Sequence, residues 1–187
     1  MPKRILDKRS RLVKTAVKLT YQKGFRKTTI ADIAEAAGVP LGNVFYYFKT
    51  KEEIGEAIVE QRMLGFQTLR EKWNQVDSPK ERLKAFVQNV YDNRELLARG
   101  GCPVGTFCTE LHKEEDALSR KARSLLGEPL AWLEEQFRAI GRERDSKNLA
   151  IQLLSALQGV SVLANNFRKP EFVSLETSRL MEWIGTL

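Results

Sequence analysis

The chain has 187 residues with a net charge of +7, and 42% of them are hydrophobic. That content excludes a disordered chain, and no apolar run approaches the ~20 residues that cross a bilayer. No apolar stretch follows Met1-Pro2-Lys3-Arg4, so we expect no secretory signal, no membrane partner and a cytoplasmic location. Residues 1–51 contain twelve basic and three acidic side chains, whereas the rest of the chain is nearly neutral. This asymmetry favours a polyanion-binding N-terminal segment on a neutral body.

Residue types with catalytic or metal-binding chemistry are scarce in this sequence. The chain has two cysteines, Cys102 and Cys108, and one histidine, His112. One disulfide cannot hold together a fold of this size, so we expect both cysteines to be free thiols in a reducing cytoplasm. No carboxylate pair, nucleophile triad or metal-ligand spacing is visible. We therefore expect no enzyme activity, no metal and no cofactor.

Apolar residues recur at helical spacing along most of the chain, and no strand-like alternation is visible. The sequence therefore predicts an all-α fold of about nine helices. In chain order, we expect helices over residues 5–23, 30–37, 41–47, 51–74, 79–97, 107–126, 130–141, 146–167 and 174–184. Thr50 and Glu53 have the spacing of a capping box. Residues 100–105 predict a turn because they contain three glycines and a proline, and Gly127 and Pro129 predict a further break.

The most informative segment is residues 29–48, in which two short helices would meet at Gly38. Glycine can adopt the positive φ that such a turn requires. A small core would form from Ile33, Ala37, Val39, Val44 and either Tyr47 or Phe48. The opposite face of the second helix would then expose Leu41, Gly42, Asn43, Phe45 and Tyr46. Because a helix fits the major groove, we expect these five residues to face the base edges of DNA.

The order and spacing of several short motifs resemble the TetR family of bacterial transcriptional regulators. These motifs are Gly24-Phe25, Thr28-Thr29, Ile33-Ala34, Ala37-Gly38-Val39, Gly42, Tyr47-Phe48 and Lys51-Glu52-Glu53. The resemblance covers about residues 9–55. It implies a three-helix DNA-binding domain over residues 1–50 and a helical effector-binding and dimerisation domain over residues 51–187. It also implies a homodimer that reads a palindromic double-stranded DNA operator, most often as a repressor.

Carried over by position, the resemblance assigns a role to each exposed residue of this segment. The resemblance assigns contacts with DNA phosphates to Thr29 and Lys51. The remaining assignments are base contacts for Leu41, Asn43 and Phe45, close approach at Gly42, and a DNA-backbone contact for Tyr46. Asn43 could pair with adenine or bind a phosphate, and the sequence leaves both open.

Three positions depart from the common family pattern. Pro40 stands where a capping Ser or Thr is frequent, Leu41 where a basic residue is frequent, and Phe45 where a tyrosine is frequent. These changes favour thymine-methyl contacts or shape readout over an arginine–guanine pair. The N-terminal segment also contains a basic cluster, which consists of Lys3, Arg4, Lys8 and Arg9. This cluster forms either a solvated face of the first helix or an arm that runs along the DNA phosphates.

The segment 146–167 is apolar nearly all round, so both of its faces must be covered. One face can pack on its own subunit and the other on a twofold mate, with small residues permitting close approach. Candidate interface residues are Leu149, Leu153, Ala156, Leu157, Val160, Leu163, Leu180 and Trp183. The alternative is a central helix of a monomer.

The family resemblance also implies a small-molecule effector that loosens DNA binding. Candidate lining residues are Phe66, Phe86, Tyr91, Cys102, Phe107, Trp132, Phe137 and Leu153. The alternative is that these residues belong to the ordinary hydrophobic core of the body and contact no ligand. Few charges lie in the apolar stretches, which mildly favours a neutral or apolar aromatic effector.

Cys102 lies at the predicted helix break, where a following helix N-terminus would lower the pKa of its thiol. Some TetR relatives have a similar Gly-Cys-x-x-Gly element and respond to electrophiles or oxidants. Three interpretations follow: an inert buried side chain, a switch that releases DNA when Cys102 is modified, or the nucleophile of a thiol-dependent enzyme.

Overall fold

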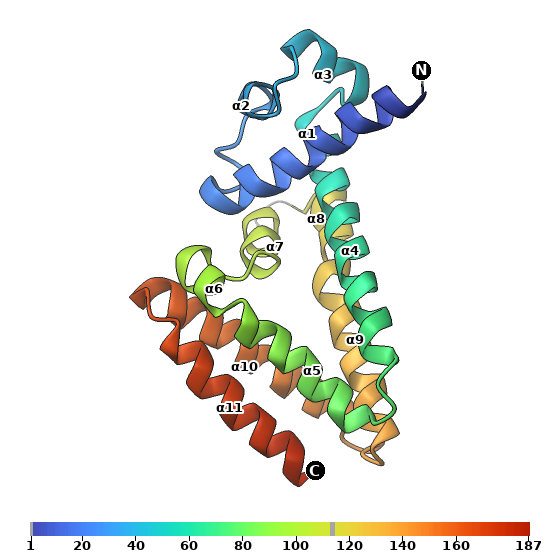
Figure 1. The fold of residues 1–187 in the computed structure, drawn as a ribbon, viewed down its shortest axis with the longest axis vertical. Coiled ribbons are helices and arrows are strands. Elements are labelled where there is room, and N and C mark those ends of the chain that lie inside the picture. The colour runs from blue at the N-terminus through green and yellow to red at the C-terminus, as the bar shows by residue number, and fades with distance from the viewer. Residues whose placement is uncertain (1, 113–114) are drawn as a thin grey trace. The chain divides into compact units, whose positions relative to one another are not determined.

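This computed structural model describes residues 2–112 and 115–187. The regular secondary structure of these residues consists of α-helices alone (Figure 1). The eleven helices of the described residues are α1 (Pro2–Lys23), α2 (Ile30–Ala36), α3 (Leu41–Tyr47), α4 (Lys51–Asn74), α5 (Pro79–Asp92), α6 (Arg94–Gly100), α7 (Gly105–Leu111), α8 (Ala117–Ala122), α9 (Ser124–Ala139), α10 (Ser146–Phe167) and α11 (Glu171–Thr186). Single residues separate α5 from α6 and α8 from α9. Counting each pair as one bent helix gives nine, so the predicted all-α fold is confirmed.

The chain forms two compact units. The head unit contains residues up to 65 together with 106–125, and the body unit contains residues 66–105 and 126–187. The chain therefore passes from one unit to the other inside α4, at the start of α7 and inside α9. These are units of packing, and a functional division at residue 50 stays a prediction.

The head unit is built around the apolar stripe of α1. Leu12, Val13 and Ala16 are buried, and Thr20 stays in the same stripe because its hydroxyl donates to the Ala16 carbonyl oxygen at 2.8 Å. Helix α2 packs on both α1 and α3. The turn between α2 and α3 has Gly38 at a φ of +61°, a conformation that residues with a Cβ rarely adopt. This glycine sets the angle between the two short helices, as predicted.

The body unit is a layered helical bundle in which α5, α10 and α11 run alongside one another (Figure 1). Its core contains Leu83, Leu133, Phe137, Leu153 and Leu180, all fully buried. Burial of a side chain of this size stabilises a fold by roughly 1.5–3 kcal/mol. The body unit thus has a large apolar core of its own.

Three predicted helix boundaries are wrong. The helix expected over residues 107–126 ends at Leu111, and a separate helix, α8, begins at Ala117, where the Asp116 carboxylate accepts the Ser119 N–H at 2.6 Å. The helix expected over residues 79–97 ends at Asp92, because the Asn93 side chain donates to the Asn89 carbonyl oxygen at 2.7 Å and the chain restarts as α6. The break expected at Gly127 and Pro129 is absent, since α9 runs through Pro129, and the break falls at Arg123. The broken segment at residues 101–104 is confirmed.

The described helices include none with the length and apolar content needed to cross a membrane.

Candidate nucleic-acid interface

Helix α3 has one buried and one exposed face. Val44 is completely buried, and Phe48 rather than the half-buried Tyr47 completes the small core. The residues predicted to face DNA are all exposed: Leu41, Gly42, Asn43, Phe45 and Tyr46. Tyr46 has 71% of its surface exposed, although an aromatic side chain gains most from burial. An apolar and aromatic surface therefore lies beside Asn43 on a helix narrow enough to enter the major groove.

The start of α3 forms without a side-chain cap. Pro40 precedes the helix with a φ of −53° and accepts the Asn43 N–H at 2.8 Å through its carbonyl oxygen. The fixed φ of proline already suits a helix start. The replacement of a capping Ser or Thr by Pro40 therefore leaves α3 beginning at Leu41, as predicted.

Helix α2 begins with a complete capping box. The Thr29 hydroxyl accepts the Asp32 N–H at 3.1 Å, and the Asp32 carboxylate accepts the Thr29 N–H at 2.8 Å. Lys23 Nζ lies 2.8 Å from the same carboxylate. The Lys23 ammonium, followed by the N–H and hydroxyl of Thr29, lowers the pKa of Asp32 from 3.8 to about 2. Thr29 is exposed, so its cap role leaves it accessible to a phosphate.

We expect the Asp32 cap to make the stability of the fold acid-sensitive. A carboxyl group with a lowered pKa contributes stability that is complete above pH 3.8 and is lost as the pH falls toward about 2. The difference in unfolding free energy between the wild type and Asp32→Asn should therefore shrink between about pH 5 and about pH 2. Urea unfolding followed by circular dichroism at several pH values measures this difference.

The control for this experiment is the Lys23→Met background. Without the ammonium, the pH dependence of the Asp32→Asn difference should become smaller, because the largest cause of the lowered pKa is removed while both Thr29 donors remain. A difference that stays constant with pH in the wild-type background would contradict the assignment.

Two lysines flank the exposed face and already bind main-chain carbonyl oxygens. Lys51 Nζ donates to Arg26 O at 2.9 Å and lies 4.8 Å from the centre of the Phe25 ring. Lys49 Nζ donates to Phe45 O at 2.6 Å. An ammonium group has three N–H donors, so each lysine can keep this bond and still offer a donor to a phosphate.

The basic cluster of α1 is described only in part. The Arg9 guanidinium lies 5.1 Å from the centre of the Phe48 ring, so this side chain covers the small core of the head unit. Lys8 is half-buried. The side chains of Lys3 and Arg4 lie outside the described residues, and both interpretations of this cluster stay open.

Four aromatic rings gather in the body unit, and three of them belong to the predicted effector residues. The Trp73 ring centre lies 5.3 Å from that of Trp132, 5.4 Å from that of Phe86 and 6.1 Å from that of Phe66. Trp73 itself was not predicted. The geometry of these pairs is tilted or edge-on, which is favourable for aromatic rings.

The other predicted effector residues are spread over both units. Phe137 and Leu153 are fully buried in the core that contains the aromatic rings. Tyr91 and Cys102 are half-buried in the body unit. Phe107 lies in the head unit, where its ring packs edge-on against that of Phe25.

Helix α10 also has a buried and an exposed face. Five predicted interface residues are buried within the chain itself: Leu149, Leu153, Leu157, Val160 and Leu180. Ala156 and Trp183 are half-buried, and Leu163 is exposed. The exposed face of α10, here called the α10 stripe, carries Ile151, Ser155, Gly159, Val162, Leu163 and Phe167. A side chain packed inside its own subunit has no surface left for another, so this stripe carries the exposed large apolar side chains that α10 can offer to a second copy.

Asp32, Lys23 and Lys49 of the head unit were not predicted as functional residues, although the sequence carries a signal for one of them. Asp32 follows Thr29 at the spacing of a capping box, a signal visible in the sequence. Lys23 and Lys49 gave no signal, because nothing in a basic segment marks which lysine pairs with a carboxylate or a carbonyl oxygen.

Comparison with known proteins finds relatives of the segment that contains this helix-turn-helix. Residues 12–58 match the sequence model for bacterial regulatory proteins of the tetR family. An uncharacterized HTH-type transcriptional regulator in the lacX 3' region of Lactococcus lactis subsp. lactis is 24% identical over 85% of this chain and 89% of that protein. The HTH-type transcriptional repressor NemR of Escherichia coli K12 is 27% identical over 64% of this chain and 60% of its own length.

Solved structures share the fold along most of the chain. The reduced form of E. coli NemR matches with a TM-score of 0.78 at 21% identity, covering 92% of this chain and 94% of that one. FadR from Bacillus subtilis, in complex with stearoyl-CoA, matches with a TM-score of 0.71 at 22% identity, covering 94% and 96%.

The fold and the exposed face of α3 together define an all-α protein with a helix-turn-helix head. The matched residues place this helix-turn-helix in the TetR family of transcriptional regulators, as the motifs predicted.

Proposed function

We propose that this chain is a transcriptional repressor that binds a palindromic double-stranded DNA operator as a homodimer and is released by a small-molecule effector. The observation that carries the proposal is the exposed face of α3, with Asn43 between apolar and aromatic side chains, on a strongly basic segment. Packing within the subunit does not explain why these apolar and aromatic side chains are exposed together. Contact with base edges does, since the major groove offers both hydrogen-bonding groups and thymine methyls.

Homodimerisation follows from the limited reach of one short helix. Two recognition helices about 34 Å apart read successive major grooves and so double the number of base contacts. We place the interface at the α10 stripe, where Val162 and Leu163 are exposed and Ser155 and Gly159 permit close approach. The buried residues Leu149, Leu153, Leu157, Val160 and Leu180 then support this face from within the subunit.

We place the effector in the body unit, next to the aromatic cluster of Trp73, Phe86 and Trp132. FadR of B. subtilis was solved with stearoyl-CoA, so a regulator of this fold accommodates a large ligand. The aromatic surface favours a neutral or apolar effector. Its binding must favour a state in which the two heads are wrongly spaced for the operator.

Modification of Cys102 is the alternative route of release. Cys102 Sγ accepts the Gly105 N–H at 3.3 Å and the Gln158 side-chain amide at 3.4 Å. Neither donor is a general base. Release by modification requires Cys102 to react only once, whereas the alternative, a thiol-dependent enzyme, must regenerate its nucleophile in every cycle.

We expect Asn43→Ala and Tyr46→Ala to weaken binding to a duplex selected by the wild type from random-sequence DNA. Each lost contact should cost about 1–3 kcal/mol per subunit. If Asn43 pairs with adenine, the loss should be confined to duplexes with that base. If it binds a phosphate, affinity should fall equally for all sequences and the salt slope should stay unchanged, because a neutral amide releases no counterion. Fluorescence anisotropy at several salt concentrations separates these outcomes.

A matched control is Gln67→Ala, which removes an exposed amide from the part of α4 that lies in the body unit. Its affinity should equal that of the wild type. Equal wild-type affinity for selected and scrambled duplexes would contradict sequence-specific control.

A further inference from the structure

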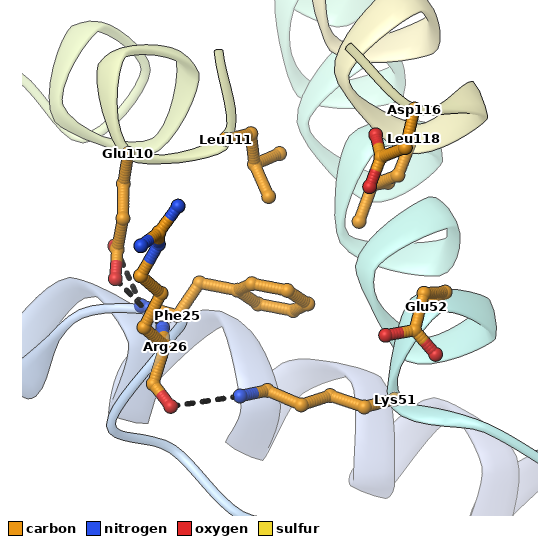
Figure 2. Close-up of a pocket in the computed structure, with 8 residues that line it drawn as sticks. All are labelled: Phe25, Arg26, Lys51, Glu52, Glu110, Leu111, Asp116 and Leu118. Carbon is orange, nitrogen blue, oxygen red and sulfur yellow. Dashed lines mark hydrogen bonds between the residues drawn. The ribbon is translucent and has the colours of Figure 1, made fainter. Parts of the chain in front are cut away.

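The turn between α1 and α2 is held by a carboxylate that comes from α7. Glu110 Oε2 accepts the Phe25 N–H at 2.8 Å, and Glu110 Oε1 accepts the Arg26 N–H at 2.7 Å (Figure 2). Each oxygen therefore binds one of two consecutive main-chain N–H groups. Hydrogen bonds to an ionised group at these distances are among the stronger ones in proteins.

The backbone of this turn is shaped to receive an anion. Gly24 has a φ of +85°, which turns the following N–H groups toward a common point. Both Glu110 oxygens would lie 3.1 Å from a Cβ added at Gly24. The absence of a side chain at this position thus lets the carboxylate approach the turn closely.

Three further contacts hold the same turn. The Phe107 ring lies edge-on to the Phe25 ring, with centres 5.6 Å apart, and Phe107 is one helical turn before Glu110 on α7. From α4, the Lys51 ammonium lies over the Phe25 ring and donates to Arg26 O. Figure 2 shows Glu110 and Lys51 reaching this segment from different helices. The turn leads directly into α2, so its position helps to fix the helix-turn-helix.

Helix α7 is also where the chain enters the head unit from the body unit. Gly105, its first residue, belongs to the body unit, and the rest of α7 belongs to the head unit. The segment just before it contains Cys102, which binds Gln158 of α10 through its sulfur atom. A movement of this segment is therefore passed by covalent connection to the helix that carries Phe107 and Glu110.

We propose that Glu110 is a positioning residue, through which α7 sets the place of the α1–α2 turn and hence of the recognition helix on DNA. This inference rests on the proposed DNA-binding function. It identifies the contact of Glu110 with the α1–α2 turn as the point at which the body unit would control DNA binding. An effector acts through this contact if it moves α7, because a carboxylate that binds two N–H groups tolerates little displacement. Coupling of this kind is reciprocal, so binding of DNA must also change α7.

The first test needs no DNA. Amide hydrogen exchange is measured by mass spectrometry on the wild type, Glu110→Ala and Glu110→Gln, the last retaining one oxygen acceptor and the side-chain shape. We expect exchange of the Phe25 and Arg26 amides to become at least about tenfold faster in Glu110→Ala and to be intermediate in Glu110→Gln. The control variants Thr109→Ala, next to Glu110 on α7, and Glu35→Gln, a lost carboxylate on α2, should leave these amides unchanged.

The second test uses a duplex selected by the wild type and a scrambled duplex of equal length. Glu110→Ala should bind the selected duplex at least about tenfold more weakly, whereas its affinity for the scrambled duplex should match that of the control Glu35→Gln, so that only specificity falls. Glu35→Gln also removes a negative charge and should change affinity for both duplexes equally. In the wild type, the selected duplex should slow exchange over residues 105–112. In Glu110→Gln, this slowing should be lost while protection of α3 remains.

Normal exchange of Phe25 and Arg26 in both Glu110 variants would overturn the proposal. So would protection of α7 by DNA in Glu110→Gln that equals the wild-type value. If the wild type selects no duplex, the proposed function itself fails, whereas the first test still decides whether Glu110 holds the turn.

Discussion

A Val162→Glu variant is expected to be a folded monomer that binds DNA weakly and without sequence preference. Val162 lies in the α10 stripe with 60% of its surface exposed, so the substitution leaves the core of the subunit intact. In the proposed homodimer the same position occurs twice near the twofold axis, and two carboxylates would be buried close together. An unpaired buried charge costs several kcal/mol, which is enough to abolish a dimer.

The loss of the dimer should have a far larger effect on operator binding than any single base contact. A monomer keeps its phosphate contacts and so keeps non-specific affinity, with a Kd of about 10⁻⁴–10⁻⁶ M at physiological salt. Specific complexes are typically at least about 10³-fold tighter than non-specific ones. We therefore expect affinity for the selected duplex to fall about a thousandfold or more, while affinity for the scrambled duplex stays within a few-fold of the wild type.

Sedimentation velocity and fluorescence anisotropy on the same samples measure both parts of this prediction. Val76→Glu is the matched control, since it places the same charge on another exposed valine of the body unit, in the turn after α4. It should remain dimeric and bind the operator normally. A dimeric Val162→Glu would place the interface elsewhere, and a monomeric wild type with specific binding would remove the need for any interface.

Prediction from the sequence succeeded where structure depends on neighbours along the chain. The exposed face of α3 follows from the spacing of Val44 and Phe48 and from the turn at Gly38, all within a few residues. The predicted start of α2 at Ile30 also agrees with the structure and depends on residues next to it in the chain. These features need no knowledge of the rest of the molecule.

Prediction was less complete where the partner is distant in the sequence. Helix α10 is apolar on most sides, so its composition could not show that Leu153 and Leu157 face the core while Ile151 and Val162 face outward. That choice depends on α5, α6 and α11, which pack against one another or against α10. Glu110 gave no signal for a similar reason, since it binds main-chain groups 84 and 85 residues away. A backbone N–H is present at almost every residue and cannot reveal which side chain it binds.

Replacing Trp132 with alanine is expected to lower the unfolding free energy of the body unit by about 3–5 kcal/mol. Trp132 was predicted as an effector residue, yet only 2% of its surface is exposed and its ring contacts those of Trp73 and Phe86. Its Nε1–H donates to Asn74 Oδ1 at 3.0 Å. Removal of the ring would leave a cavity between two aromatic side chains and an amide oxygen without its donor.

A Trp132→Phe variant separates these two effects. Phenylalanine refills most of the cavity but cannot donate to Asn74, so the loss should be about 1–2 kcal/mol. Urea unfolding at a fixed protein concentration measures both variants, because the stability of a homodimer depends on concentration. Leu96→Ala, at an exposed residue of α6, is the control and should change the unfolding free energy by about 0.5 kcal/mol or less.

The size of the loss distinguishes a core residue from a residue that lines an open effector site. A side chain that fills the core stabilises the free protein, and its removal is seen without any ligand. A side chain at the wall of an open site contributes little until the effector binds, so Trp132→Ala would then unfold almost like the wild type. A loss near 4 kcal/mol would assign Trp132 to the packing that holds α4, α5 and α9 together, and would make the half-buried Phe66 and Tyr91 the better candidates for contact with the effector.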